Sequence, residues 1–157
     1  MDFIIRKIEQ EEIKILDIFL YEAIFIPEDV KKPPINIINQ PELQVYVKEF
    51  GTKTGDICFV AEIDGKIVSA VWVRIINDYG HVDDETPSLA ISILKEYRGN
   101  GIGTELMKKM LAELRTDGFK KVSLSVQKQN YAVKMYKKIG FEIINENEEE
   151  LLMIYQL

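Results

Sequence analysis

The 157-residue sequence predicts an α+β fold: a mixed, mostly antiparallel sheet with one central parallel strand pair, flanked by helices. Short β-rich apolar runs alternate with stretches of helical spacing, and an Asp64-Gly65 dipeptide suited to a tight turn separates two of these runs. Two later strands are joined by a helix, and a helical crossover makes its two strands parallel. At this length we expect one domain, residues 1–157.

The first half of the chain is expected to hold a strand and two helices. Residues 3–8 form a short apolar run typical of a strand, and residues 11–24 place apolar side chains three or four positions apart, as on a helix. Residues 24–40 contain three prolines, which exclude a continuous helix and predict a loop-rich connection. A second helix is expected over residues 41–50, with Pro41 at its start.

The rest of the sheet follows. Residues 57–63 and 66–75 are β-rich runs on either side of the Asp64-Gly65 turn and should pair antiparallel. The later elements are expected in this order: a strand over 88–94, an amphipathic helix over 101–116, a strand over 121–126, a helix over 130–139 closed by Gly140, and a strand pair over 141–144 and 151–156. The buried stripe of the long helix is expected to be Ile102, Leu106, Met110 and Leu114.

The composition limits the class of protein. Asp and Glu number 26 against 20 Lys and Arg, a net charge of -6, which argues against a partner that is a nucleic acid or an anionic membrane. No apolar window approaches the roughly 20 residues of a membrane-spanning helix, and no signal-peptide core is apparent, so we expect a cytoplasmic protein. One cysteine and one histidine, Cys58 and His81, exclude an internal disulfide and a structural zinc site, so no metal is expected.

A glycine-rich turn, residues 98–104, lies between an apolar strand and the long amphipathic helix. Its alternate glycines let the backbone turn sharply and bring N–H groups close to a ligand. The following helix adds unpaired amides and the positive end of its dipole, so phosphate is the ligand that this turn favours. A P-loop is excluded because no lysine follows any of the three glycines, and the dinucleotide fingerprint fails because Thr104 stands where its third glycine belongs.

Other residues must decide between a phosphate site and a turn that serves only the fold. Basic side chains gather around this turn and the later short helix: Lys95, Arg98, Lys108, Lys109, Lys134, Lys137 and Lys138. A solvated helix face explains some of them equally well.

A second constellation lies at residues 130–141, which read Asn130, then Tyr136, then Gly140-Phe141. Together with the glycine-rich turn it resembles the GNAT superfamily of N-acetyltransferases, whose features are an Arg/Gln-x-x-Gly-x-Gly/Ala turn and a later Asn…Tyr…Gly-Phe helix. The resemblance covers residues 87–141, and the order of the earlier elements agrees with the family's fold. Residues 1–76 carry no motif of their own.

The resemblance implies that acetyl-CoA is the cosubstrate. Its pyrophosphate would lie on the turn, its pantetheine arm along the preceding strand, and the cofactor-side asparagine would be Asn130, with Tyr131 lining the same groove. The residues so implied are Ile91, Ser92, Ile93, Arg98, Gly99, Asn100, Gly101, Ile102, Gly103, Thr104, Asn130 and Tyr131. Two parallel strands that part near their ends also leave unpaired backbone groups that an amide-bearing ligand satisfies.

The implied chemistry is acyl transfer to an amine, for which Tyr136 matches the tyrosine that protonates the departing thiolate. A phenol, with a pKa of about 10, is a plausible acid for a thiolate. The base is open. The family's glutamate on the strand before the asparagine helix is absent here, where Ser123, Ser125 and Gln127 stand.

Asp83, Asp84 and Glu85 are alternative bases acting through water, although such acids are usually only solvated, and His81 is expected at the surface. Cys58 and Trp72 are expected to be core residues.

The resemblance places the acceptor pocket at residues 24–40, near 83–85 and at 146–150, and the acids there would attract a cationic amine, either a small molecule or a peptide. An acyl-CoA-binding regulatory module with little catalysis is the first alternative, because the strand glutamate is missing. A small interaction domain without a CoA site is the second, and a homodimer stays open.

Overall fold

A computed structural model describes residues 2–76 and 81–157 of the chain. Seven strands form one sheet in the order β1-β2-β3-β4-β5-β7-β6, and β4 and β5 are its one parallel pair within the described residues. The strands are β1 (Ile4–Lys7), β2 (Ile57–Ile63), β3 (Lys66–Arg74), β4 (Ser88–Ile93), β5 (Lys121–Gln127), β6 (Glu142–Glu146) and β7 (Glu150–Gln156). The predicted mixed, mostly antiparallel sheet with a central parallel pair is therefore confirmed.

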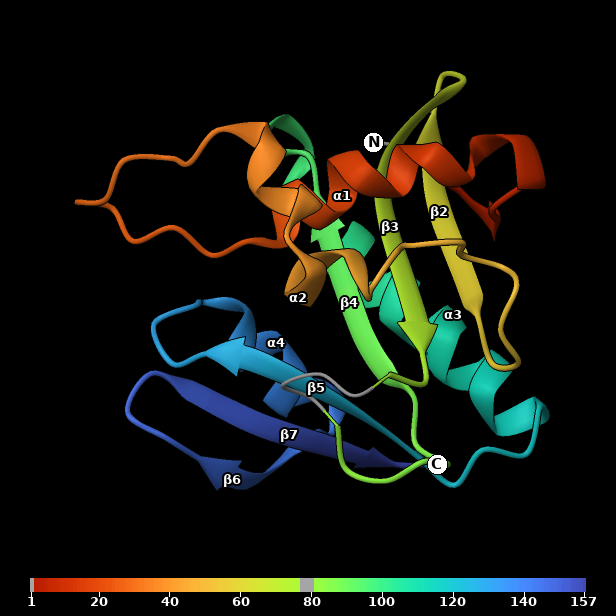
Figure 1. The fold of residues 1–157 in the computed structure, drawn as a ribbon. Coiled ribbons are helices and arrows are strands. Elements are labelled where there is room, and N and C mark those ends of the chain that lie inside the picture. The colour runs from red at the N-terminus through yellow and green to blue at the C-terminus, as the bar shows by residue number, and fades with distance from the viewer. Residues whose placement is uncertain (1, 77–80) are drawn as a thin grey trace.

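Helices cover both faces of this sheet (Figure 1). The α-helices are α1 (Leu16–Ala23), α2 (Pro41–Gln44), α3 (Ile102–Thr116) and α4 (Ala132–Ile139), and the short 3-10 helices are η1 (Gln10–Ile15), η2 (Ile35–Asn39) and η3 (Lys95–Tyr97). α1 packs on the face of β3 and β4 that carries Ala70 and Trp72, while α3 packs on the opposite face, against Phe59 and Val71. In the described chain, no helix is both long and apolar enough to cross a membrane.

The long helix α3 buries the predicted stripe. Ile102, Leu106, Met110 and Leu114 are all at most 1% exposed, so the 3.6-residue periodicity of this segment reports its packing correctly. Met107 and Leu111 widen the stripe, because the helix lies across β2 and β3 rather than touching them along one line.

Two predicted helices are shorter in the structure. The stretch expected to be one helix over 11–24 begins as 3-10 turns in η1 and becomes α-helical only at Leu16. η1 is held to the sheet by Glu12, whose carboxylate accepts two 2.8 Å hydrogen bonds from the guanidinium of Arg6 on β1. The same carboxylate accepts a hydrogen bond from the backbone N–H of Glu9 at 2.9 Å. Glu12 therefore ties the first residues of η1 both to one another and to β1, which favours 3-10 turns over an α-helix there.

The helix expected over 41–50 was also too long, since α2 ends at Gln44. The guanidinium of Arg74 donates to the carbonyl oxygens of Val45 at 3.2 Å and Lys48 at 2.6 Å. Those carbonyls would accept from later amides if the helix continued, so Arg74 replaces the helical bonds. Gly51, with φ +95°, completes the departure from helix.

Candidate active site

The glycine-rich turn joins η3 to α3 and has the conformation that its sequence demands. Gly99 and Gly101 have φ of +81° and +79°, a region that residues with a Cβ rarely adopt. Gly101 is the N-cap of α3, so the chain enters this 15-residue helix directly from the turn. Gly103 lies on the inner side, where an added Cβ would come within 3.2 Å of Ile93 Cδ1.

Backbone amides at this turn are available to a ligand. In the described part of the chain, no acceptor receives a hydrogen bond from the N–H groups of Gly101, Ile102, Gly103 and Thr104. The dipole of a long helix places about half a positive charge at the same point. Free donors and positive potential together make the start of α3 a site for an anionic group.

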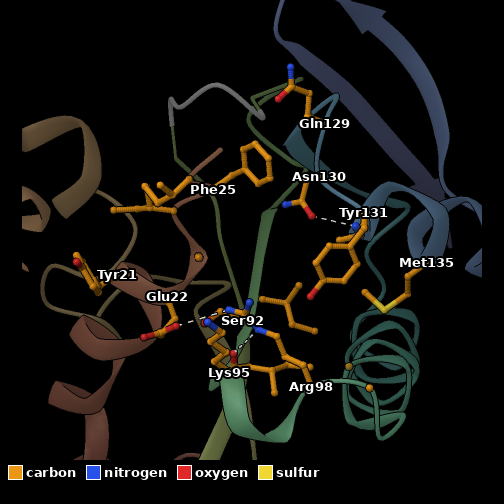
Figure 2. A pocket seen from close by; sticks show the side chains of 18 of the residues that line it. Tyr21, Glu22, Phe25, Ser92, Lys95, Arg98, Gln129, Asn130, Tyr131 and Met135 are labelled. Carbon is orange, nitrogen blue, oxygen red and sulfur yellow. Dashed lines mark hydrogen bonds and ion pairs between the residues drawn. The ribbon is translucent and has the colours of Figure 1, made fainter. Parts of the chain in front are cut away.

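A cavity of about 1260 Å³ opens beside these amides. Its walls come from the residues after α1, from the end of β4, from the turn, and from the start of α4 (Figure 2). The residues of the predicted cofactor set that line it are Ile91, Ser92, Ile93, Arg98, Gly99, Gly101, Ile102, Gly103, Thr104, Asn130 and Tyr131, and Tyr136 also lines it. Asn100 is the one member of that set outside the lining, because its side-chain amide donates to the carbonyl of Tyr97 at 3.1 Å.

The cavity exists because β4 and β5 part. Ser88 pairs with Ser123 at the beginning of both strands, and the described register holds no further pair between them. Figure 1 shows the two strands diverging from that point. Since β4 stays paired with β3 along its whole length, the parting exposes only the edge of β4 that faces β5.

The direction of the β4 backbone groups follows from the register. The N–H of Leu94 donates to the carbonyl of Val68 at 2.9 Å, so the even-numbered residues of β4, including Ser92, direct their backbone groups toward β3. Ile91 and Ile93 therefore direct theirs into the opening. Ser92 lines the cavity, but its hydroxyl donates to the carbonyl of Phe19 on α1 at 2.6 Å.

Arg98 bridges the two sides of the cavity entrance. Its Nε donates to the carbonyl oxygen of Ile93 at 3.0 Å, and its Nη2 lies 3.6 Å from a carboxylate oxygen of Glu22 on α1 (Figure 2). Both contacts leave guanidinium donors unused, because this group carries five N–H bonds. The guanidinium of Arg98 therefore places a positive charge next to the free amides of α3.

The start of α4 forms the wall opposite α1. Asn130 lies just before this helix: its Oδ1 accepts from the N–H of Ala132 at 2.9 Å, which leaves the amide nitrogen on the cavity side (Figure 2). Tyr131 beside it is 69% exposed. Met135, which no sequence pattern singled out, also lines the cavity, from α4. Phe25 lines it from the chain after α1, within the segment 24–40 that the resemblance gives as part of the acceptor pocket.

Tyr136 lies deeper and is only 7% exposed. Burial, with a smaller contribution from nearby Tyr131, raises the pKa of its phenol above the ordinary value of about 10. No hydrogen-bond partner of its hydroxyl is found among the described residues. Tyr136 is thus a protonated phenol at the cavity wall with its donor uncommitted.

The acids before β4 lie elsewhere. Asp83, Asp84 and Glu85 precede the strand, and none of the three lines the cavity, which begins at Ile91. The carboxylate of Asp83 accepts a hydrogen bond from the Thr86 hydroxyl at 2.8 Å and forms an ion pair with Lys121 at 3.2 Å. These contacts, the Thr86 hydrogen bond above all, lower the pKa of Asp83. His81 pairs with Asp84 at 3.2 Å. These groups stabilise the loop.

The two residues expected in the core are there. Trp72 is 1% exposed and its indole N–H donates to the carbonyl of Tyr46 at 3.2 Å. Cys58 is buried, and burial raises the pKa of its thiol, so it is not a nucleophile.

A second, smaller hollow of about 590 Å³ lies between α3 and α4 and shares Thr104 and Met135 with the main cavity. Three cations line it, Lys108, Arg115 and Lys138. The positive potential of the turn therefore continues along the outer side of α3.

A helix N-terminus and a parted strand edge around one cavity are typical of proteins that bind a long ligand carrying both phosphate and amide groups. Comparison with known proteins narrows this class. The model of the acetyltransferase (GNAT) family matches residues 24–141. The chain belongs to the acetyltransferase (GNAT) family, which confirms the resemblance inferred from its two motifs.

Relatives and solved structures agree with this assignment. The chain is 38% identical over 87 residues to the probable N-acetyltransferase camello of Xenopus tropicalis, covering 54% of this chain and 38% of that protein. It is 34% identical over 93 residues to an N-alpha-acetyltransferase of Sulfurisphaera tokodaii, and this match covers 54% of this chain and 55% of that protein. The PaiA N-acetyltransferase of Thermoplasma acidophilum, solved with coenzyme A, has the same fold, with a TM-score of 0.74, 18% identity and full coverage of both chains. The chain spans less than two thirds of these sequence relatives.

Proposed function

We propose that this chain is a single acetyltransferase domain that moves the acetyl group of acetyl-CoA to a primary amine by direct attack of the amine on the thioester. The observation that carries the proposal is one cavity that joins the free amides of α3, the guanidinium of Arg98 and the unpartnered phenol of Tyr136. Solved family members with coenzyme A, such as PaiA, support acetyl-CoA as the cosubstrate.

The donor atoms of the cavity fit the parts of acetyl-CoA in order. The diphosphate suits the amides of residues 99–104 together with Arg98. The amides of the pantetheine arm suit the backbone groups of Ile91 and Ile93, which lack a strand partner on that side. The remaining phosphate on the ribose suits the cationic hollow beside α3.

Tyr136 supplies the proton that the departing thiolate needs. The amine nitrogen forms a bond to the carbonyl carbon as the carbon–sulfur bond breaks, and the phenol O–H donates its proton to sulfur. The proton that the nitrogen loses as the amide forms passes through water and restores the phenol. Burial keeps this phenol protonated at neutral pH, which is the state an acid requires. An N–H of Ile91 or Ile93 stabilises the negative charge that develops on the carbonyl oxygen.

The acceptor is proposed to be a cationic primary amine, of a small molecule or a peptide. Glu28 and Asp29 on the segment after α1 line the cavity and favour a positive charge. The names of several relatives, among them an N-alpha-acetyltransferase and a ribosomal protein bS18-alanine N-acetyltransferase, support a peptide amine within this class.

Two measurements test the proposal. Heating with and without acetyl-CoA should give a higher melting temperature with the ligand, because binding to the native state stabilises it by mass action. Coenzyme A release should then be followed with a panel of a polyamine, an aminoglycoside and a short peptide with a free N-terminus. Turnover with at least one amine is the expected result.

The outcomes separate the alternatives. A shift in melting temperature without turnover of any amine favours an acyl-CoA-binding regulatory module, for which the missing strand glutamate at Ser125 is the argument. If the melting temperature does not change at saturating acetyl-CoA, both the acetyltransferase and the acyl-CoA-binding module are contradicted. The remaining alternative is then a small interaction domain without a CoA site.

A further inference from the structure

One carboxylate lies beside the strand opening, just outside the lining of the cavity, and has no place in the chemistry above. Glu150, the first residue of β7, is half-buried. Its Oε2 accepts a 2.7 Å hydrogen bond from the hydroxyl of Ser125, and its Oε1 accepts from the side-chain amide of Gln127 at 3.3 Å. Two side chains of β5 thus hold the carboxylate in one orientation.

Ser125 is the position at which the strand glutamate is missing from the sequence. Glu150 reaches it because β5 and β7 pair antiparallel with Gln127 opposite Glu150 and Ser125 opposite Leu152. The carboxylate comes from the neighbouring strand, 25 residues later in the chain.

The side of the sheet follows from strand alternation. Val122, Leu124 and Val126 of β5 are buried in the core beneath α3 and α4, so Ser125 and Gln127 point to the opposite face. That is the face on which α1 lies. Tyr136 belongs to the core on the α4 side, so Tyr136 and Glu150 flank β5 from opposite faces.

Glu150 also lies next to the opening along the strand. β4 and β5 pair only at Ser88 and Ser123, so Ser125 and Gln127 stand on the part of β5 that has left β4. The carbonyl of Gln127 accepts from the N–H of Asn130 at 2.9 Å, and Asn130 lines the cavity. Gln127 therefore contacts Glu150 through its side-chain amide and contacts Asn130, a residue of the cavity wall, through its backbone carbonyl.

The carboxylate of Glu150 has no cationic partner within residues 2–76 and 81–157. Among the residues described, no lysine, arginine or histidine nitrogen lies within ion-pair distance of Glu150, and the nearby Lys128 pairs instead with Glu146 at 3.7 Å. Glu22, on the α1 side of the cavity, differs because it already pairs with Arg98. A fixed carboxylate with neutral donors and no cation is suited to a positively charged ligand.

We propose that Glu150 binds the ammonium group of the acceptor and accepts its proton before or during attack on the thioester. This inference rests on the acetyltransferase function proposed above. An N–H bond of the ammonium breaks and its proton moves to a carboxylate oxygen of Glu150, and the nitrogen lone pair then forms the bond to the carbonyl carbon. The carbon–sulfur bond breaks, and the thiolate takes the phenol proton of Tyr136. The second proton that the nitrogen loses as the amide forms returns through water to the phenolate of Tyr136. Base and acid act from the two faces of the opening between β4 and β5.

The test compares Glu150→Gln with wild type, and Glu142→Gln serves as a matched control because Glu142 is an exposed carboxylate on the neighbouring strand β6, outside every segment placed at the site. The best amine of the panel above is the probe. At pH 7 we expect kcat/KM for this amine to fall about 100-fold or more in Glu150→Gln, the usual effect of losing a base. The acetyl-CoA dissociation constant and the melting temperature should stay near wild type, and Glu142→Gln should match wild type throughout.

The pH profile separates a base from a structural contact. As the pH approaches the pKa of the amine, the free amine becomes abundant and the deficit of Glu150→Gln should narrow. Ser125→Ala, which removes only the hydrogen bond that orients the carboxylate, should give a smaller loss with the same pH trend.

Three outcomes overturn the inference. If wild type turns over an amine and Glu150→Gln retains that rate, Glu150 has no role although the enzyme function stands. If the deficit of Glu150→Gln is the same at every pH, the carboxylate does not act as a base. If wild type binds acetyl-CoA but acetylates no amine, the proposed function fails and this inference fails with it.

Discussion

The guanidinium of Arg98 reaches back to the end of β4, where its Nε donates a 3.0 Å hydrogen bond to the carbonyl oxygen of Ile93. This bond fixes the cation between the last residue of the strand and the first amides of α3. It also occupies one of the two backbone carbonyls that face the strand opening. The arginine is therefore oriented before any ligand arrives, and its contribution to ligand binding can be measured.

Replacing Arg98 with alanine should weaken acetyl-CoA binding without unfolding the protein. A hydrogen bond to a charged group contributes about 1.5–3 kcal/mol, so the dissociation constant should rise by about 10-fold to 100-fold. Calorimetric titration with acetyl-CoA at two salt concentrations measures this, and the salt dependence should decrease in the variant. Lys14→Ala, an exposed cation on η1, is the control. Equal affinity in Arg98→Ala and wild type would remove Arg98 from the phosphate site.

Gly101→Ala should destabilise the turn and the ligand site together. Nothing lies within 4 Å of the added Cβ, so the cost comes from its φ of +79°, about 1–2 kcal/mol for an L-residue. Gly65→Ala is a matched control, since Gly65 has φ +80° and equally open space but belongs to the β2–β3 hairpin. Urea unfolding should show similar losses in both variants, while acetyl-CoA affinity should fall only in Gly101→Ala. A parallel loss of affinity in both would mean that stability alone controls binding.

The substitution Tyr136→Phe should preserve the fold but remove the phenol hydroxyl that is proposed as the general acid. The ring still packs against Phe141, at a centroid distance of 5.9 Å in the wild type, so the melting temperature should change little. Removing a general acid lowers kcat by about 100-fold or more.

The pH dependence gives an independent check on Tyr136. Because the pKa of this phenol is raised, the acid form persists above the ordinary value of about 10. The rate of wild type should show no alkaline decline up to about pH 10. Full activity of Tyr136→Phe, or a decline near pH 8 in wild type only, contradicts the role.

The buried ion pair between Asp56 and Arg74 should make the free energy of unfolding decrease at acidic pH. Burial acts to raise the pKa of Asp56, but hydrogen bonds from Arg74 and from the N–H groups of Lys53 and Gly51 outweigh it, so the net pKa is lowered. The ionised carboxylate therefore stabilises the fold above its unfolded pKa of about 3.9, and this contribution is lost as the pH falls through the lower folded-state value. Unfolding in urea should show the loss below pH 4.

Asp56→Asn should remove that acid-dependent part and cost about 3–5 kcal/mol at pH 7, as expected when one partner of a buried pair is removed. Arg74 and Asp56 side chains are only 2% and 1% exposed, so solvent cannot replace the lost partner. Glu148→Gln, at an exposed acid in the β6–β7 turn, should leave both stability and its pH profile unchanged.

Much of the fold could be predicted because its patterns are local. The hairpin at Asp64-Gly65, the buried stripe of α3 and the strand-turn-helix at residues 88–116 each depend on residues close in sequence. The cavity-lining residues of the two motifs are likewise carried by short segments. The failures at residues 11–24 and 41–50 have the opposite origin. There, Arg6 and Arg74 from the sheet bind groups of the helical segment, and no periodicity in the segment reports that contact.

The position of Glu150 could not be predicted either, because it also depends on a contact between separate segments of the chain. Its place beside Ser125 depends on the register of β5 with β7, and a shift by one residue would direct it to the other face. Sequence alone presented it as one of several acids in a turn. The hydrogen bonds from Ser125 and Gln127 distinguish it from Glu148 and Glu149.

The walls of the cavity come from parts of the chain with unequal freedom to change. The strand edge of β4, the start of α3 and the start of α4 are attached to the core through the buried or partly buried side chains of Ile93, Ile102 and Tyr136. The opposite wall, from Ile24 to Pro33, has no regular secondary structure. Substitutions in this one irregular segment can therefore reshape the proposed acceptor side of the cavity without altering the proposed acetyl-CoA side.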